Sequence, residues 1–435
     1  YATKQECIDN FCKIFHQKSG NEWKDKEKFE KVPKKYQLLK FKKRINHKEF
    51  LKPYDLKDPE IARTSLPKEI KQMIEGFTSV KMYQKAFDEY EIDREYLPMD
   101  QLSKPLLTEA KSILLEISEL IEELEKMRTD KKSENNFDEI LKMREEIADK
   151  SSRYYELIPN SRYRQTAIPP INTPHQLKEH SDMLDSLLDY EVAIKIILGS
   201  IYRMKEINPL EYCYNSLNIK LMPLIKESPE FQVLRQYVKN GHEGYNEDFI
   251  QNIFAVERKG EAENFAKWKT TKNHMLLWHG SKLSNYMGIL NQGLRIAPPE
   301  APTTGYMFGK GVYFADVFDK SYGYCDDYGS EQDYVLLMLC EVALGDMKEL
   351  HQAEFVTDLK HPYKSVKGVG RRGPKFKQGI VMSNGATVPC GKMIEYKSNE
   401  KDPHRWNRLE YNEYIVYDVS QIRVRYLVQV KKNEQ

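Results

Sequence analysis

Residues 276–324 read LLWHGSKLSNYMGILNQGLRIAPPEAPTTGYMFGKGVYFADVFDKSYGY and form the centre of the sequence pattern. The short apolar run Met275–Trp278 predicts a strand that delivers His279-Gly280-Ser281. After Gly293, a Pro-rich loop leads to a second predicted strand, Val312–Phe314. Polar and aromatic groups therefore lie at strand ends beside glycines, which let a ligand approach the backbone closely. This arrangement is typical of a binding site.

The C-terminal part of the chain, residues 239–435, is rich in short runs of Val, Ile, Tyr and Leu punctuated by Gly, Pro and Asn. The predicted strands are 252–257, 275–278, 312–314, 334–342, 413–419 and 424–430. They indicate a mixed, mainly antiparallel sheet. The chain has neither a G-x-G-x-x-G between strand and helix nor a G-x-x-x-x-G-K-[ST], which excludes the Rossmann and P-loop schemes for a nucleotide.

Two other kinds of site are also disfavoured. No Ser-His-Asp nucleophile elbow is present, and no cluster of metal ligands appears in the sequence. The six cysteines are scattered without C-x-x-C spacing, so we expect free thiols and no zinc site.

Residues 65–238 show helical periodicity instead. The clearest helix, Leu106–Leu124, keeps one apolar stripe for more than five turns, and a second strong helix covers His180–Met204. Thr129–Asn136 predicts a loop, after which another helix begins near Phe137. These elements predict a helical bundle, so the fold class is α+β, a helical bundle followed by the sheet.

The N-terminal residues 1–50 carry a local basic excess, although the whole chain is nearly balanced, with 68 Lys+Arg against 66 Asp+Glu. A helix is expected over residues 6–18, and the basic run Lys31–Arg44 interleaves Tyr36 and Phe41. Basic residues with aromatics can hold phosphates and stack on bases. A solvated charged face over an ordinary core is the alternative.

The remaining features bound the architecture. At 435 residues the chain is expected to hold two or three domains. The longest apolar runs, such as Tyr334–Cys340, are too short to span a bilayer. No secretory leader opens the chain, and its first residue is Tyr rather than Met, which suggests a trimmed fragment.

Four residues around the central stretch could carry chemistry. His279 at a strand end could donate a hydrogen bond to a sugar hydroxyl, or be structural. Tyr313 and Tyr324 could sandwich a flat heteroaromatic ring, although simple packing is the alternative in a chain with 28 tyrosines. Glu413 lies in a run of strong strand formers, where a carboxylate needs a partner or a task unless it faces solvent.

The motifs His279-Gly280-Ser281, GLRIAPPEAP, TGYMFGKG, YFAD and Tyr411-Asn412-Glu413-Tyr414 resemble the catalytic domain of the DNA-dependent poly(ADP-ribose) polymerases. The resemblance covers nearly the whole chain. It implies the C-terminal part of a WGR domain over 1–50, a linker over 51–64, a helical autoinhibitory domain over 65–238 and an ADP-ribosyltransferase domain over 239–435. The Trp-Gly-Arg strand that names the WGR module is not in this chain.

The resemblance implies roles for individual residues. His279, Tyr313 and Glu413 would form the catalytic set. His279 would hold the adenine-ribose 2'-hydroxyl. Tyr313 and Tyr324 would stack on nicotinamide. Glu413 would bond the nicotinamide ribose and polarise the acceptor.

Further residues would surround this set. The Gly280 backbone and the Ser321 hydroxyl would bond the carboxamide. The residues expected on the adenosine side are Ser281, Gly288 and Arg295, those on the acceptor or product side are Lys320 and Tyr306, and those on the regulatory helix are Asp189 and Glu191. Tyr322 and Gly323 stand where relatives have Ala and Asn, so the bulky Tyr322 could alter the acceptor side or inhibitor fit without changing the core chemistry.

By the same resemblance NAD+ is consumed as a substrate, nicotinamide is released, and neither a metal nor a permanently bound cofactor is needed. Expected partners are damaged DNA, through the WGR region, and acceptor proteins including chromatin proteins and the enzyme itself, in the nucleus. A mono-ADP-ribosyltransferase of the same group, or a non-catalytic module that binds DNA or ADP-ribose, are the alternatives.

Overall fold

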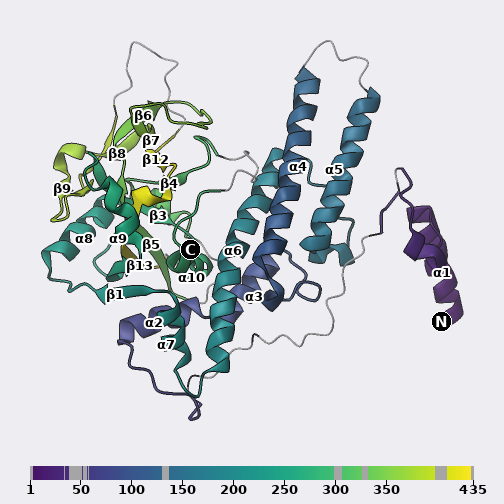
Figure 1. Ribbon diagram of the computed structural model, residues 1–435, viewed down its shortest axis with the longest axis horizontal. Helices are drawn as coiled ribbons and strands as arrows, with labels where there is room; N and C mark the ends of the chain where they lie inside the picture. The colour runs from purple at the N-terminus through teal and green to yellow at the C-terminus, as the bar shows by residue number, and fades with distance from the viewer. Residues whose placement is uncertain are drawn as a thin grey trace.

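The computed structural model describes residues 3–33, 35–38, 51, 56, 58–129, 137–297, 306–325, 332–396 and 409–432. A helical part lies beside a sheet-rich part, and the N-terminal helix α1 lies apart from both (Figure 1). No helix within these ranges is long and apolar enough to cross a membrane.

The helical part begins at Lys68 and confirms the predicted bundle. Its helices are α2 Lys68–Phe77, α3 Val80–Glu89, α4 Lys104–Thr129, α5 Phe137–Leu157, α6 Pro174–Tyr202 and α7 Pro209–Ser216. The longest helix, α6, starts where the Thr173 side chain accepts a hydrogen bond from the Gln176 N–H and Pro174 takes the first turn. The apolar stripe of α4 packs with α5 and α6 into one core.

The C-terminal part is built on a seven-stranded sheet in the order β1-β2-β13-β5-β3-β10-β9. Its strands are β1 Ile219–Pro223, β2 Ile250–Arg258, β3 His274–Gly280, β5 Tyr334–Ala343, β9 Ile380–Val381, β10 Thr387–Val388 and β13 Ile422–Lys431. All neighbours are antiparallel except β10 and β3. Every residue of β5 is buried, because apolar clusters cover both faces of the sheet there.

A second sheet has the order β4-β12-β7-β6, and β11 and β8 form a separate antiparallel two-stranded sheet. The strands are β4 Val312–Phe314, β6 Asp346–Leu350, β7 Tyr363–Gly368, β8 Arg372–Pro374, β11 Met393–Glu395 and β12 Glu413–Val416. The helices of this part are α8 Pro229–Gly241, α9 Glu261–Phe265, α10 Tyr286–Gln292 and α11 Phe318–Tyr322. The mixed, mainly antiparallel sheet is thereby confirmed.

The change from helices to sheet comes earlier than residue 239, where the sequence pattern suggested it. β1 at Ile219–Pro223 already pairs with β2 along its whole length. This strand was not predicted because it is short, follows directly on α7, and is completed only by a partner that comes later in the chain.

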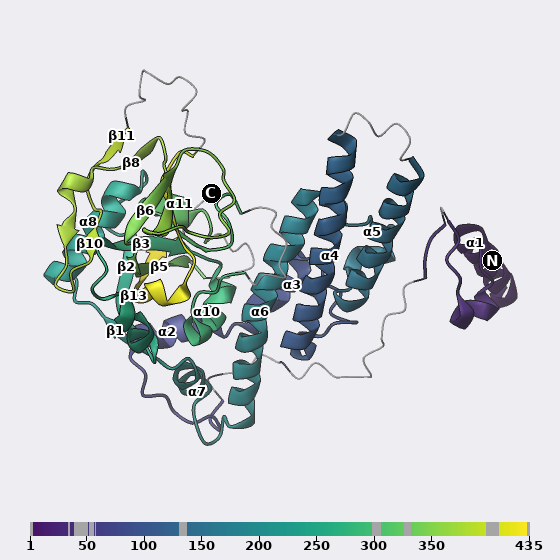
Figure 2. The same cartoon turned by 45° about the horizontal axis from the view of Figure 1, so that its top comes forward.

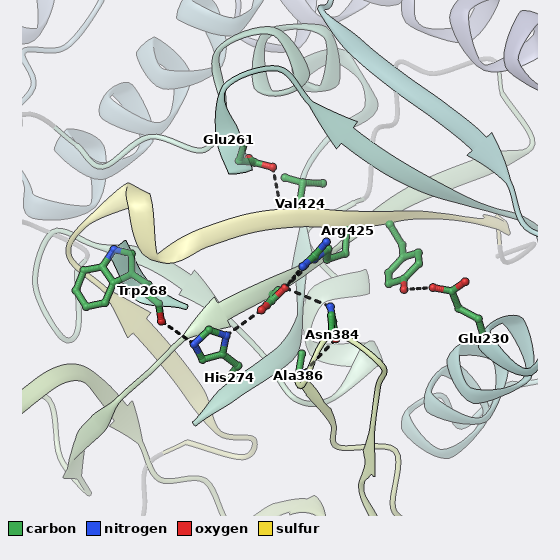
Figure 3. Close-up of polar contacts among 10 residues, drawn as sticks. Glu230, Glu261, Trp268, His274, Asn384, Ala386, Val424 and Arg425 are labelled. Carbon is green, nitrogen blue, oxygen red and sulfur yellow. Dashed lines mark hydrogen bonds and ion pairs between the residues drawn. The ribbon is translucent and has the colours of Figure 1, made fainter. Parts of the chain in front are cut away.

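A buried ion cluster fastens the sheet at the end of β5 (Figure 3). Glu341 accepts hydrogen bonds from Arg425 Nε at 2.7 Å and Asn384 at 3.3 Å, and His274 Nδ1 lies 2.8 Å away. The other nitrogen of His274 meets the Trp268 carbonyl at 3.0 Å. Because each oxygen of this buried carboxylate has a partner, the cluster satisfies its charge within the core.

The N-terminal segment forms α1, Lys4–Ser19, with a capping box between Thr3 and Glu6. Phe11 and Phe15 pack edge-on against Trp23 at 4.9 and 5.1 Å between ring centroids. The helix expected over 6–18 is confirmed. Residues 34 and 39–44 of the basic run, and residues 52–55 and 57 of the expected linker over 51–64, lie outside the described residues.

Short 3₁₀ turns connect several of these elements. They are η1 Trp23–Lys28, η2 Met99–Gln101, η3 Ser161–Arg164, η4 Ala266–Trp268, η5 Leu283–Asn285, η6 Phe376–Gln378 and η7 Val419–Gln421.

Candidate active site

The two sheets meet where β3 ends. Trp278 and Ala315 exchange both backbone hydrogen bonds, at 2.8 and 3.0 Å, so the end of β3 is tied to the end of β4. This bridge brings His279 beside Tyr313, and the pairing of β4 with β12 adds Glu413. Three residues far apart in the sequence therefore gather at one sheet junction.

His279 is fixed by its neighbour on β4. Its Nδ1 donates to the Tyr313 carbonyl at 2.9 Å, and burial lowers the pKa of the imidazole. The neutral ring therefore keeps its proton on Nδ1 and offers a lone pair on Nε2. In this tautomer Nε2 would accept from a sugar hydroxyl instead of donating to it, and the role of His279 at a sugar stays a prediction.

Tyr313 is held at its hydroxyl as well as at its backbone. The hydroxyl donates to the Gly309 carbonyl at 2.8 Å and accepts from the Phe308 N–H at 3.1 Å. Burial, and after it the charge of Glu413, raises the pKa of Tyr313 to about 12. The ring is consequently neutral and rigid, as a stacking surface requires.

Glu413 opens β12, the strand between β4 and β7. Its Oε1 forms an ion pair with Lys320 of α11, and only 14% of the Glu413 side chain and 15% of the Lys320 side chain are exposed. The partner that a carboxylate on an interior strand needs is therefore Lys320. Sequence reasoning had placed Lys320 on the acceptor side without linking it to Glu413.

A network of buried hydrogen bonds, which the sequence did not predict, holds the two neighbours of Glu413 in place. Buried Asp316 accepts hydrogen bonds from Asn412 at 2.7 Å and from Tyr414 at 2.9 Å, the two residues that flank Glu413. Asn412 in turn accepts from the Gly370 N–H at 3.0 Å. Burial raises the pKa of Asp316 to about 6. The one sequence feature that could have pointed to this network is the acidic residue Asp316 at the end of the YFAD run.

Gly280 and α11 form the next wall of the site. A Cβ at Gly280 would lie 1.9 Å from the Ser321 carbonyl oxygen, so no other residue fits. The backbone of buried Ser321 therefore lies directly against β3. Tyr324, two residues beyond the end of α11, is 64% exposed.

Tyr322 packs against the aromatic cluster beside α11. Its ring stacks on Phe318 at 5.5 Å and lies 5.7 Å from the ring of His242. Tyr322 therefore contributes to the packing of α11, and its expected effect on the acceptor side stays a prediction.

Helix α6 covers the other side of the site, with α10 between α6 and the sheet (Figure 2). Asp189 forms an ion pair with Arg295, and a Cβ at Gly288 would lie 2.5 Å from the Asp189 Cα. Tyr190 adds a hydrogen bond to Ser284 at 2.9 Å. The two predicted adenosine-side residues Gly288 and Arg295 are thus in contact with the predicted regulatory residue Asp189.

Two more acids of α6 face the same side. Burial raises the pKa of the Tyr306 hydroxyl, and the charges of Asp185 and Asp182 raise it further, so Tyr306 lies near this helix face. Asp185 is paired with Lys111 of α4. The spacing of three and four residues from Asp182 through Asp185 to Asp189 places all three on one face.

Glu191 is not part of this contact. Two residues further along a helix, it lies about 200° around the axis from Asp189. It pairs with Lys195 of the same helix. Ser281, by contrast, lies at the site, where its hydroxyl accepts from Asn285 at 3.0 Å.

The geometry defines a class: a helical bundle whose acidic helix leans on a two-sheet domain carrying a His, a Tyr and a Glu at one sheet junction. Within the described ranges, no three His, Cys, Asp or Glu side chains gather as metal ligands do. Two family descriptions match, the poly(ADP-ribose) polymerase regulatory domain over residues 64–214 and the poly(ADP-ribose) polymerase catalytic domain over residues 228–432. The chain belongs to the poly(ADP-ribose) polymerase family.

Curated relatives agree along the whole chain. Poly [ADP-ribose] polymerase 1 of Danio rerio is 38% identical over 100% of this chain and 40% of its own length. Poly [ADP-ribose] polymerase 2 of Zea mays is 37% identical over 99% of this chain and 62% of its own length, and that of Arabidopsis thaliana is 36% identical over 100% and 65%. The chain therefore spans less than two thirds of each of these relatives. Neither family description covers residues 1–63, so the WGR assignment stays a prediction.

Proposed function

We propose that the chain is an NAD+-consuming ADP-ribosyltransferase that builds poly(ADP-ribose) on proteins and releases nicotinamide. The observation that carries this proposal is the placement of Glu413, a carboxylate fixed by Lys320 and by the Asp316 network at the junction shared with His279 and Tyr313.

The proposed chemistry follows from that carboxylate. Breaking the bond between nicotinamide and ribose builds positive charge on the ribose, as in glycoside cleavage. A carboxylate held beside the ribose stabilises this charge as it develops. The same carboxylate can accept the proton of an incoming hydroxyl, and an ADP-ribose hydroxyl as acceptor gives a chain.

The other site residues would bind and orient NAD+. The Nε2 lone pair of His279 would accept from a hydroxyl of the adenine ribose. Tyr313, with its hydroxyl occupied by Gly309 and Phe308, would present a fixed face to nicotinamide, and Tyr324 would close on the other side. The bare backbone of Gly280 leaves room for the carboxamide to approach.

Helix α6 would regulate access. Arg295 and Gly288, the proposed adenosine-side residues, are engaged by Asp189, so bound NAD+ and the seated helix would compete for the same groups. Release of α6 by local unfolding would then switch the enzyme on. DNA strand breaks, sensed through the N-terminal region, would supply the trigger in the nucleus, and chromatin proteins and the enzyme itself would be acceptors.

The test is incorporation of labelled NAD+ by the chain, resolved on a gel, with and without nicked DNA that carries a 5'-phosphate. A ladder that DNA stimulates is the expected result. A ladder that is indifferent to DNA would support the chemistry and overturn the DNA switch in this chain. One sharp band would establish mono-transfer instead, and absence of both label and nicotinamide release would contradict the enzyme assignment.

A further inference from the structure

A buried histidine outside the proposed catalytic set is bonded to the helix that carries Lys320. His242 follows the last residue of α8, and 6% of its side chain is exposed. Its Nδ1 donates to Asp319 Oδ1 at 2.5 Å. The ring stacks on Phe249 at 4.3 Å between centroids, with an interplanar angle of 19°, and lies 5.3 Å from Phe318. The aromatic rings therefore fix the direction in which His242 donates.

Asp319 is bound by two consecutive residues at the end of α8. Besides the His242 ring, its Oδ2 accepts from the Glu243 N–H at 3.2 Å. Close packing reinforces this contact, because a Cβ at Gly241 would lie 2.9 Å from the Phe318 backbone nitrogen. The end of α8 and the start of α11 are thus joined by a carboxylate clamp and by direct backbone contact.

The clamp matters because α11 cannot hold its own position. The helix has five residues, and no side chain caps its start at Val317. A helix this short is unstable by itself, since nucleation is unfavourable and few internal hydrogen bonds form. Its orientation must therefore come from its contacts with neighbouring elements.

Lys320 directly follows Asp319, and its ammonium group pairs with Glu413. The next residue, Ser321, places its backbone against Gly280. A small rotation of α11 would move Lys320 away from Glu413 and Ser321 away from β3 together. Asp319 lies about 100° around the helix axis from Lys320 and about 200° from Ser321, so the His242–Asp319 bond holds α11 at a third point and resists such a rotation.

We propose that His242 and Asp319 form a positioning pair that holds Lys320 on Glu413 and so sets the efficiency of ADP-ribose transfer. The inference rests on the proposed function, in which Glu413 acts on the ribose and on the acceptor. The hydrogen bonds of His242 and Asp319 join the end of α8 to α11 and not to Glu413, so in this proposal both act through the position of Lys320.

Two substitutions separate the hydrogen bond from the packing. His242→Phe keeps an aromatic ring against Phe249 but removes the donor, whereas His242→Asn keeps a donor near the position of Nδ1. We expect His242→Phe to lower kcat for polymer formation about tenfold with KM for NAD+ within about twofold, and His242→Asn to restore most of the loss.

A double-mutant cycle with Lys320→Met tests whether the pair acts through Lys320. In the Lys320→Met background, His242→Phe should cost less than about twofold, because the group that it positions is gone. An equal loss in both backgrounds would overturn the proposal, and so would full activity of His242→Phe alone.

A second measurement does not depend on activity. Reductive methylation of Lys320, followed by mass spectrometry, should be about tenfold faster in His242→Phe than in the parent chain and in His242→Asn, because the ion pair protects the amine. Unchanged methylation would overturn the positioning role, whereas faster methylation in a chain with no transferase activity would retain it and reject the proposed function. If His242→Phe does not fold, Asp319→Ala serves in the same assays, since the Asp319 side chain is 27% exposed.

Discussion

Two carboxylates approach the proposed NAD+ site from opposite sides, and each is paired with a cation. Glu413 stands on a strand held between two others, and its partner Lys320 belongs to the same domain. Asp189 stands on a helix of the regulatory bundle, and its partner Arg295 belongs to the catalytic domain. The first pair lies within the sheet-rich part, and the second joins this part to the helical bundle.

This difference fits the two proposed roles, catalysis for Glu413 and regulation for Asp189. Glu413 cannot move without disrupting β12 and the bonds of Asn412 and Tyr414 to Asp316. In the proposed switch Asp189 would leave with α6, while the strand pairing of the sheet would remain. Catalytic electrostatics require fixed groups, whereas a switch requires an element that can be removed at low free-energy cost.

The largest effect should come from removing the fixed carboxylate. Glu413→Gln should keep NAD+ binding but lower polymer synthesis by about 10²–10³-fold, because the neutral amide cannot stabilise positive charge on the ribose. Labelled NAD+ incorporation and calorimetric NAD+ binding test this, with exposed Glu395→Gln as the control. Normal polymer length in Glu413→Gln would sink the assigned role.

The next effect concerns pH and the removable carboxylate. Burial raises the pKa of Asp189 to about 7, which the Arg295 and Lys111 charges only partly oppose and the Asp185 charge increases. Because the pKa of Asp189 is raised when α6 packs on the catalytic domain, protonation of Asp189 favours the packed state. The free energy of packing is therefore most favourable below about pH 4 and becomes less favourable as the pH rises through 7.

The equilibrium constant for packing of α6 on the catalytic domain should therefore fall about tenfold between pH 6 and pH 8. Hydrogen exchange of α6 residues reports this directly, without any influence from the pH dependence of catalysis. Asp189→Asn, which mimics the neutral acid, should stay protected across that range. Equal pH dependence in both chains would show that another group titrates.

Tyr190→Phe should weaken the packing of α6 on the catalytic domain by a smaller amount. This change removes the hydrogen bond to Ser284 but retains the buried ring, and one such bond contributes about 0.5–1.5 kcal/mol. Activity without DNA should rise about two- to tenfold, while activity with nicked DNA stays the same. Tyr202→Phe, on the exposed end of the same helix, is the matched control. A fall in both activities would indicate damage to the fold instead.

The sequence was informative where a pattern is local. The continuous apolar run at 334–342 predicted β5, and the spacing of apolar residues over 180–204 predicted most of α6. Periodicity records which face of an element is buried, so it survives without knowledge of the partner.

What escaped prediction depends on distant partners. Lys320 and Glu413 are 93 residues apart, and Asp316 and Asn412 are 96 apart, so no spacing rule links them. The tautomer of His279 depends on a carbonyl that only the bridge between β3 and β4 brings near. Asp189 and Glu191 looked equivalent in sequence, and only the packing of α6 on α10 distinguishes them.

The smallest effect is expected from Asp316→Asn, which tests whether the hydrogen bonds of Asp316 are enough to hold Glu413 in position. In Asp316→Asn the side-chain oxygen can still accept from Asn412 and Tyr414, so activity should stay within about twofold. Because burial raises the pKa of Asp316 to about 6, its charge reduces stability increasingly from about pH 4 to pH 6. Removing the charge should stabilise the fold at pH 8 by at most about 3 kcal/mol.

The real gain from Asp316→Asn should be smaller, because Oδ1 is buried with no hydrogen-bond partner in the described part of the chain, and an amide there would be unpaired as well. Thermal unfolding at pH 4 and pH 8 measures it: the variant should gain over the parent at pH 8 and lose that gain at pH 4. A large loss of activity with unchanged stability would mean that the charge of Asp316 acts on Glu413 electrostatically, in addition to the positional constraint from its hydrogen bonds.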